Sequence, residues 1–329
     1  MNNEMYLIEK KGCDTVERNS GIYSHMDCFL MTMELVYTSM NLDFKTMFVN
    51  SWRFDYNPDN KDLAVYSYEE YMKMISSEYL EVSRKKIPKK DVTVENLKRY
   101  IDKYQTVVMT IDCQCCPWHR GYHVASIWHA CALTGYTEEG IWCTDPFIKG
   151  YETFLVPENV FEYGDFYYYT STTDPQNMDM NGLMKYIISK EDSIMEGIKM
   201  VQVFDEDIRK TKNGSDLFDI PEDIYLCTIT NGLKAISDYR YQLAFLLEGL
   251  YNKLTKEDEK RKEIYTLLYH VSDMWLKVQH MIVRLFYEPR RLEKTKEKIS
   301  SHIISIIEIE KKILSEMKEC VNEYISYEK

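Results

Sequence analysis

The stretch that decides the fold runs from residue 123 to residue 146 and reads His123-Val-Ala-Ser-Ile-Trp-His129-Ala-Cys-Ala-Leu-Thr-Gly135-Tyr-Thr-Glu-Glu-Gly-Ile-Trp-Cys-Thr-Asp145-Pro146. Small, apolar and β-branched side chains dominate residues 127–136, and a Glu-Glu-Gly turn leads into a second short run that ends at Asp145. The pattern predicts a β-hairpin with His129 and Asp145 near the same rim. Because adjacent strands lie about 4.8 Å apart, one hydrogen bond can join the imidazole to the carboxylate. A His oriented by an Asp is two thirds of a catalytic triad, which lacks only a nucleophile.

Cys28 is the candidate nucleophile, because it precedes a helix-periodic apolar run that ends at Ser39. Ser24, followed three residues later by Asp27, loosely fits a capping box and predicts that Cys28 lies in the first turn of this helix. The positive end of the helix dipole would then favour the thiolate. Cys28 or His129 alone would more often be a packing residue. An early Cys, a His on a strand and an Asp one strand later together favour nucleophilic acyl chemistry.

The first half of the chain predicts helices followed by antiparallel strands, which is an α+β arrangement. Aromatic residues at 42–64 suggest strand or loop packed on the first helix. The expected elements are helices at 66–81 and 93–103, the latter opened by a Thr cap, a buried strand at 105–111, and strands at 151–156 and 164–170 on either side of a helical turn.

The second half predicts a helical bundle, because its apolar residues recur at three- and four-residue spacings. Expected helices cover 184–203, 221–254, 257–287 and 291–327. We therefore expect two domains, an α+β domain at 1–173 and an all-α accessory domain at 174–329. The apolar stripes could pair with a second copy as a homodimer, or could satisfy one another.

Composition excludes several classes of protein. The chain has 329 residues, a formal net charge of −12 and 45% hydrophobic residues. The acidic balance argues against nucleic-acid binding, and the sequence has neither a signal-peptide pattern nor an apolar run long enough for a membrane span. Nine cysteines without small-domain spacing indicate reduced thiols. These features predict a soluble, cytoplasmic protein that binds no membrane.

The segment 113–123 holds three thiols and two imidazoles, which are the ligands that zinc prefers. Cys115 and Cys116 are adjacent, so their side chains would diverge, and no Cys-x2-Cys pair is present. We therefore predict no metal, and a loop in which Trp118, His119 and His123 line a substrate pocket. His123 is also the alternative to His129 as the base.

A basic run lies at residues 84–90. Such runs are usually solvated loops. Alternatively, this one is a docking site for an acidic carrier protein.

Several of these motifs together resemble a known family. His129 is followed by Gly135-Tyr136 and Asp145-Pro146, as in the His-containing hairpin of papain-like enzymes of the bacteriocin-processing peptidase type. More narrowly, the chain over roughly residues 20–170 resembles the butirosin biosynthesis protein H family, and a narrower similarity is to a papain-like, amide-forming transferase of the closthioamide pathway. The positions that carry this resemblance are Asp27-Cys28, Asp112, Pro117, His123, His129, Gly135-Tyr136 and Asp145-Pro146.

The resemblance implies a cysteine acyltransferase with a papain-like fold. Cys28 would be the nucleophile, His129 the general base and acid, and Asp145 the residue that orients it. The donor would be an acyl or peptidyl carrier protein that presents a thioester on its phosphopantetheine arm, and the acceptor a small amine such as a diamine. No other cofactor is implied.

Three points stay open. Papain-type enzymes usually place a Gln shortly before the Cys to hold the oxyanion; residues 18–27 contain none, and Asn19, Ser24 or His25 could take its place. A cysteine peptidase would use the same triad on a peptide. In a non-catalytic binding module, Cys28 would be a packing residue.

Overall fold

The computed structural model describes residues 21–59, 61–63, 82–148, 152–172, 180–218, 227–253 and 258–327. The chain forms two compact units. Unit 1 comprises residues 1–46 and 78–176, and unit 2 comprises residues 47–77 and 177–329. Their helices and antiparallel strands confirm the α+β class.

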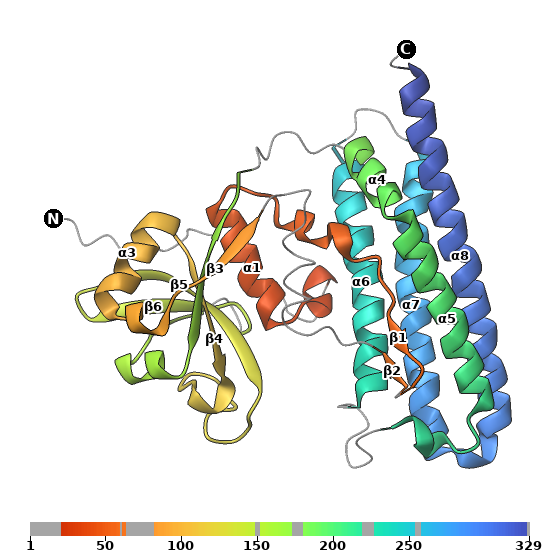
Figure 1. The fold of residues 1–329 in the computed structure, drawn as a ribbon, viewed down its shortest axis with the longest axis horizontal. Helices are drawn as coiled ribbons and strands as arrows, with labels where there is room; N and C mark the ends of the chain where they lie inside the picture. The colour runs from red at the N-terminus through yellow and green to blue at the C-terminus, as the bar shows by residue number, and fades with distance from the viewer. Residues whose placement is uncertain are drawn as a thin grey trace. The chain divides into compact units, whose positions relative to one another are not determined.

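Unit 1 is built on a six-stranded antiparallel sheet with the strand order β3-β8-β4-β5-β6-β7 (Figure 1). β4 and β5 lie in the middle, and both are almost entirely buried. The strands are β3 (Ser83–Lys86), β4 (Val107–Asp112), β5 (Trp128–Thr137), β6 (Gly140–Asp145), β7 (Glu152–Leu155) and β8 (Asp165–Thr170).

The predicted hairpin is confirmed as β5 and β6. Gly140 has a φ of 143°, which L side chains rarely adopt, and it begins β6 directly after the turn. Thr134 and Thr144 join their hydroxyl groups across the pair at 2.7 Å. A register shift between Leu133 and Gly135 marks a bulge. The other predicted strands are present at nearly the predicted residues.

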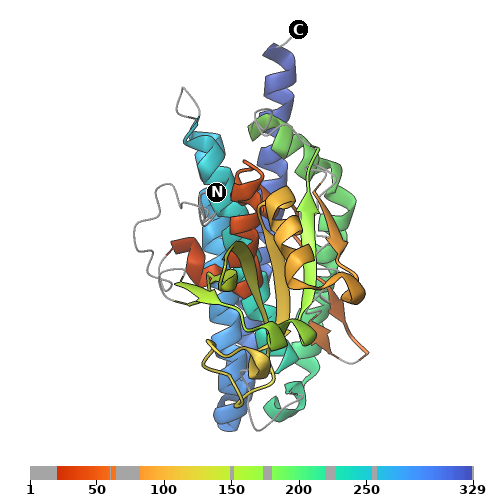
Figure 2. The ribbon, with the colours of Figure 1, turned by 90° about the vertical axis from the view of Figure 1, so that its left-hand side faces the viewer.

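Two helices, α1 (Cys28–Ser39) and α3 (Val94–Tyr104), lie on opposite sides of this sheet (Figure 1). α3 lies in front of the strands in Figure 2, and its Leu97 and Ile101 belong to the same buried core cluster as Ile111 and Leu133 of the sheet. Its predicted Thr cap is confirmed, because the hydroxyl of Thr93 accepts a hydrogen bond from the backbone N–H of Asn96. Short 3-10 helices connect these elements, namely η1 (Gly21–His25), η2 (Phe44–Asn50), η3 (Lys89–Asp91), η4 (Cys113–Cys115) and η5 (Glu158–Glu162).

The cap of α1 differs from the prediction. Asp27 is the N-cap, and its carboxylate accepts a hydrogen bond from the N–H of Leu30 at 2.8 Å. Ser24 instead donates to the carbonyl of Gly21 inside η1. The expected capping box is therefore wrong, but Cys28 does lie in the first turn, at the first residue of the helix.

Unit 2 is mainly helical, as predicted. The six apolar residues that mark the predicted stripe of the last helix are all buried, namely Ile299, Ile303, Ile306, Ile313, Met317 and Cys320. The expected helix at 184–203 is in fact two helices, and the unit also contains a pair of two-residue strands, so it is not strictly all-α. Its elements are β1 (Tyr56–Asn57), β2 (Asp62–Leu63), α4 (Met180–Ser189), α5 (Glu191–Lys210), η7 (Gly214–Leu217), α6 (Thr228–Tyr251), α7 (Glu259–Tyr287), η8 (Pro289–Arg291) and α8 (Leu292–Tyr327).

The predicted division at residue 173 places the described residues of 47–63 in the wrong unit. These residues belong to unit 2. Phe54 stacks on Trp275 with ring centroids 5.4 Å apart, and Arg240 donates to the carbonyl of Arg53 at 2.8 Å. The rings of Phe54 and Tyr56 therefore pack on the bundle, whereas the prediction was packing on the first helix. The helix predicted at 66–81 lies outside the described residues.

Among the residues that the structure describes, no helix combines the length and apolar character that a membrane crossing requires.

Candidate active site

The hairpin brings His129 and Asp145 together. His129 Nε2 lies 2.7 Å from Asp145 Oδ2, and the two side chains are 2% and 0% exposed. Asp145 Oδ1 also accepts the backbone N–H of Phe147 at 3.0 Å, which fixes the carboxylate in place. Because a carboxylate only accepts, the Nε2 atom of His129 is the donor. In the neutral ring, Nδ1 then carries the lone pair and can receive a proton.

Trp118, which was predicted to line a substrate pocket, is hydrogen-bonded to the His129–Asp145 pair. Its Nε1–H donates to the same Oδ2 atom of Asp145 at 3.1 Å. The indole is stacked on Phe154, with ring centroids 5.6 Å apart and planes 9° apart. Trp118 therefore helps to orient Asp145 and covers it, a role that the sequence did not suggest.

Cys28 lies beside the strand that carries His129. The hydroxyl of Thr32, one turn along α1, donates to the carbonyls of Cys28 and Ala130, at 2.8 and 3.2 Å. The thiol of Cys28 accepts a hydrogen bond from the backbone of Ala130, the residue after His129. Among the described residues, however, the hydrogen-bond partner of the His129 side chain is Asp145 and not Cys28.

The expectation of a Cys28 thiolate is wrong. Burial raises the pKa of the Cys28 thiol well above its ordinary value, and the negative charge of Asp27 raises it further. The hydrogen bond from Ala130 acts in the opposite direction and is outweighed. Cys28 therefore rests as a neutral thiol, so its use as a nucleophile requires a base.

Cys113 belongs to the same cluster, and the sequence did not reveal this. The sulfur of Cys113, one ring nitrogen of His119 and one ring nitrogen of His129 all lie within 4.8 Å of one another. Cys113 Sγ is 3.7 Å from His119 Nε2, and the rings of His119 and His129 have centroids 4.7 Å apart. The strand register was the missing signal: Ile111 pairs with His129, and Cys113 follows two residues later. Burial raises the pKa of the Cys113 thiol above its ordinary value.

The alternative base and the three oxyanion candidates are not members of the Cys113–His119–His129 cluster, and one of them lies outside the described residues. His123, the alternative base, is exposed on the loop before β5, with its ring on Tyr122 at 3.8 Å and a φ of 56°. Of the three oxyanion candidates, Asn19 lies outside the described residues. Ser24 donates to a carbonyl, and His25 is half-buried in η1.

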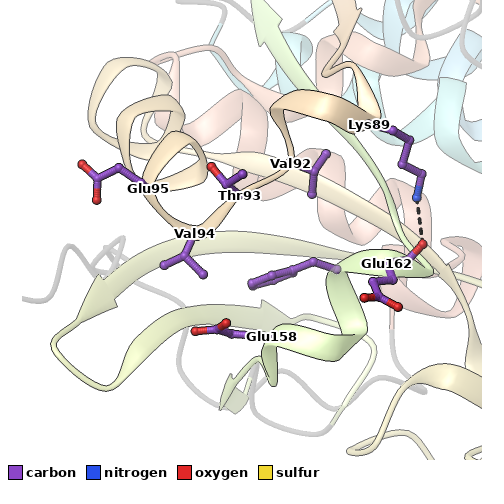
Figure 3. Close-up of a pocket in the computed structure, with 8 residues that line it drawn as sticks. Lys89, Val92, Thr93, Val94, Glu95, Glu158 and Glu162 are labelled. Carbon is purple, nitrogen blue, oxygen red and sulfur yellow. Dashed lines mark hydrogen bonds between the residues drawn. The ribbon is translucent and has the colours of Figure 1, made fainter.

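A hollow of about 690 Å³ lies elsewhere in unit 1 (Figure 3). The residues that line it are Lys89, Val92, Thr93, Val94, Glu95, Glu158, Phe161 and Glu162. Lys89 donates to the backbone carbonyl of Glu162 at 3.1 Å across one end of it. Cys28, His129 and Asp145 are not among its lining residues, so this hollow is separate from the His129–Asp145 pair.

The scan against protein-family models found no match, and neither did the search of curated proteins.

Proposed function

We propose that the protein is a cysteine-dependent acyltransferase with a papain-like catalytic unit. Cys28 is the nucleophile, His129 the general base and acid, and Asp145 the residue that orients His129. The observation that supports this most is the buried 2.7 Å His129–Asp145 pair beside the first residue of α1. A pair so placed can take a proton from a thiol, and the neutral state of Cys28 makes such a base necessary.

The reaction proceeds through an acyl-enzyme. As Cys28 Sγ attacks the carbonyl carbon of a thioester, His129 Nδ1 accepts the thiol proton, and Asp145 stabilises the imidazolium. The tetrahedral intermediate collapses, the C–S bond to the donor breaks, and the departing thiol takes the proton from His129. An amine then attacks the acyl group on Cys28, His129 accepts its proton and returns it to Sγ, and an amide is released.

The donor that we propose is an acyl or peptidyl carrier protein with its phosphopantetheine arm, as the resemblance to the butirosin biosynthesis protein H family implies. The basic run contributes the edge strand β3 and the turn after it. Lys86 is paired with Asp165 at 2.9 Å, while Lys85 and Lys90 are exposed. These positive charges fit an acidic carrier surface.

Mass spectrometry of the intact protein tests this function. After incubation with an acylated carrier, or with a small N-acetylcysteamine thioester, we expect one acyl group on Cys28 that is discharged by small amines. Cys28→Ala removes the adduct, whereas Cys115→Ser, a matched thiol in the loop after β4, keeps it. Discharge to water alone or cleavage of peptides would indicate a hydrolase, and no adduct with either donor would reject the acyl-enzyme.

Charge reversal at Lys85 and Lys90 tests the docking role separately. We expect slower transfer from the acylated carrier and unchanged transfer from the small thioester. Equal losses with both donors would remove the docking role.

A further inference from the structure

The cluster next to the proposed catalytic pair contains more ligating groups than acyl transfer uses. Cys113 and His119 take no part in the proposed reaction, yet their side chains meet that of His129 with one ligand atom of each within 4.8 Å of the others. Cys113 is buried, and His119 is half-buried. One thiol from η4, one imidazole from the loop after it and one imidazole from β5 therefore lie close together.

We propose that Cys113, His119 and His129 bind a zinc ion. Thiolate and imidazole are the ligands that zinc prefers, and three protein ligands with one position left for water are typical of an open zinc site. With ordinary Zn–S and Zn–N bonds, the sulfur and nitrogen ligands of a tetrahedral ion lie about 3.5 Å apart. Cys113 Sγ and His119 Nε2 are already 3.7 Å apart, so this edge of the tetrahedron needs almost no movement.

The surroundings of His129 suit a metal ligand as well. Its Nε2–H donates to Asp145, so Nδ1 is the ring nitrogen that remains for the ion. A carboxylate that holds the other nitrogen of a ligating imidazole fixes the ring and makes it more basic. The charge of Asp145 also favours a dication nearby.

Zinc binding requires one rearrangement, which provides a marker. The N–H of Gly121 donates to His119 Nδ1 at 3.0 Å, so the ring proton lies on Nε2. Coordination through Nε2 moves that proton to Nδ1, where it opposes the N–H of Gly121, and Cys113 releases its thiol proton to solvent. We therefore expect zinc to break the Gly121 hydrogen bond and to shift the NMR signal of the Gly121 amide.

The consequence for activity rests on the proposed function. An ion on His129 Nδ1 occupies the lone pair that would accept the proton of Cys28. Zinc is then an inhibitor that acts through Cys113 and His119, and a chelator restores activity.

Cobalt spectroscopy of the reduced full-length protein tests the site without any substrate. We expect one Co²⁺ per chain, with a thiolate-to-cobalt charge-transfer band and tetrahedral ligand-field bands that Zn²⁺ removes. Cys113→Ser should abolish the charge-transfer band and weaken binding by more than about 100-fold, and His119→Gln should weaken it by a similar factor. Cys115→Ser, a half-buried neighbour outside the trio, should leave the spectrum unchanged.

Cys28→Ala separates the two proposals. It should abolish acyl transfer and keep the cobalt spectrum, so a failure of the acyl-transfer proposal leaves the metal site testable. A charge-transfer band that disappears with Cys28 and survives in Cys113→Ser would overturn the site, as would the absence of Co²⁺ binding in the wild type. Circular dichroism of each variant confirms that the fold is retained, and the Gly121 amide gives an independent readout on the wild type.

Discussion

Among the described residues, each unit buries a carboxylate that is held by a side-chain nitrogen at the same distance. In unit 1, His129 and Asp145 meet at 2.7 Å, and in unit 2, Arg240 and Glu310 also meet at 2.7 Å. All four side chains are at most 2% exposed. Their surroundings differ. The guanidinium of Arg240 also donates to two backbone carbonyls, while the imidazole of His129 lies next to the thiol of Cys113 and the ring of His119.

The difference shows why burial and a short ion pair do not by themselves make an active site. The guanidinium of Arg240 has donors alone, and its N–H groups hold residues 51–53 against the bundle. The imidazole of His129 has a second ring nitrogen beyond the one that bonds Asp145, and this nitrogen can act as a donor or an acceptor. We therefore expect the Arg240–Glu310 pair to support structure and the His129–Asp145 pair to support chemistry.

Asp145→Asn should have the largest effect on activity. The amide of Asn would donate to His129 and stabilise the tautomer with its lone pair on the wrong nitrogen, so kcat should fall by about 10³- to 10⁴-fold. The backbone N–H of Phe147 keeps its acceptor, so most of the fold should survive. Steady-state kinetics with the small thioester measures the loss, and circular dichroism controls for folding. A variant with near-normal kcat would exclude Asp145 as the orienting residue.

Glu310→Gln should instead reduce stability. The substitution leaves the charge of Arg240 buried without a counterion, which typically costs about 3–5 kcal/mol in the free energy of unfolding. Urea unfolding followed by circular dichroism measures this, and Glu196→Gln, which removes one side of an exposed pair with Lys199, should change stability by less than about 0.5 kcal/mol. If Glu310→Gln were as stable as the wild type, the comparison between the two pairs would fail.

The sequence predicted best those features that depend on neighbouring residues. The β5–β6 hairpin, the Thr93 cap and the buried stripe of α8 all follow from local alternation, capping chemistry or helical spacing. The pairing of His129 with Asp145 is an extension of the hairpin, because a short turn fixes which strand ends meet.

Features that depend on distant parts of the chain were missed. The aromatic residues of 47–63 do not say which unit they pack against, so their place in unit 2 could not be derived. Cys113 joins His129 through the β4–β5 register, which the loop spacing alone did not fix. The helix position of Cys28 was correct, but its protonation depends on burial, which is a tertiary property.

Trp118→Phe sharpens the comparison from the side of Asp145. The substitution removes the 3.1 Å hydrogen bond to the carboxylate and keeps an aromatic ring to stack on Phe154. We expect kcat to fall by about 10-fold while KM is unchanged, because the group positions the base rather than binding substrate. Trp142→Phe removes an equivalent indole hydrogen bond, to Thr137 on the same hairpin, and should leave kcat unchanged. Equal losses in the two variants would indicate a general effect of the hairpin's stability.

Asp27→Asn tests whether the charges around Cys28 in unit 1 set the pKa of its thiol. The charge of Asp27 raises the pKa of Cys28, so its removal should lower that pKa and increase the thiolate fraction at any pH below it. Alkylation of Cys28 by iodoacetamide, followed by peptide mass spectrometry, should become about 3- to 10-fold faster at fixed pH, and its rise with pH should begin at lower pH. Asn is as good an N-cap as Asp, so the helix start is preserved. Asp43→Asn removes the same charge beyond the other end of α1 and should leave the rate unchanged; an unchanged rate in Asp27→Asn as well would mean that burial alone keeps Cys28 protonated.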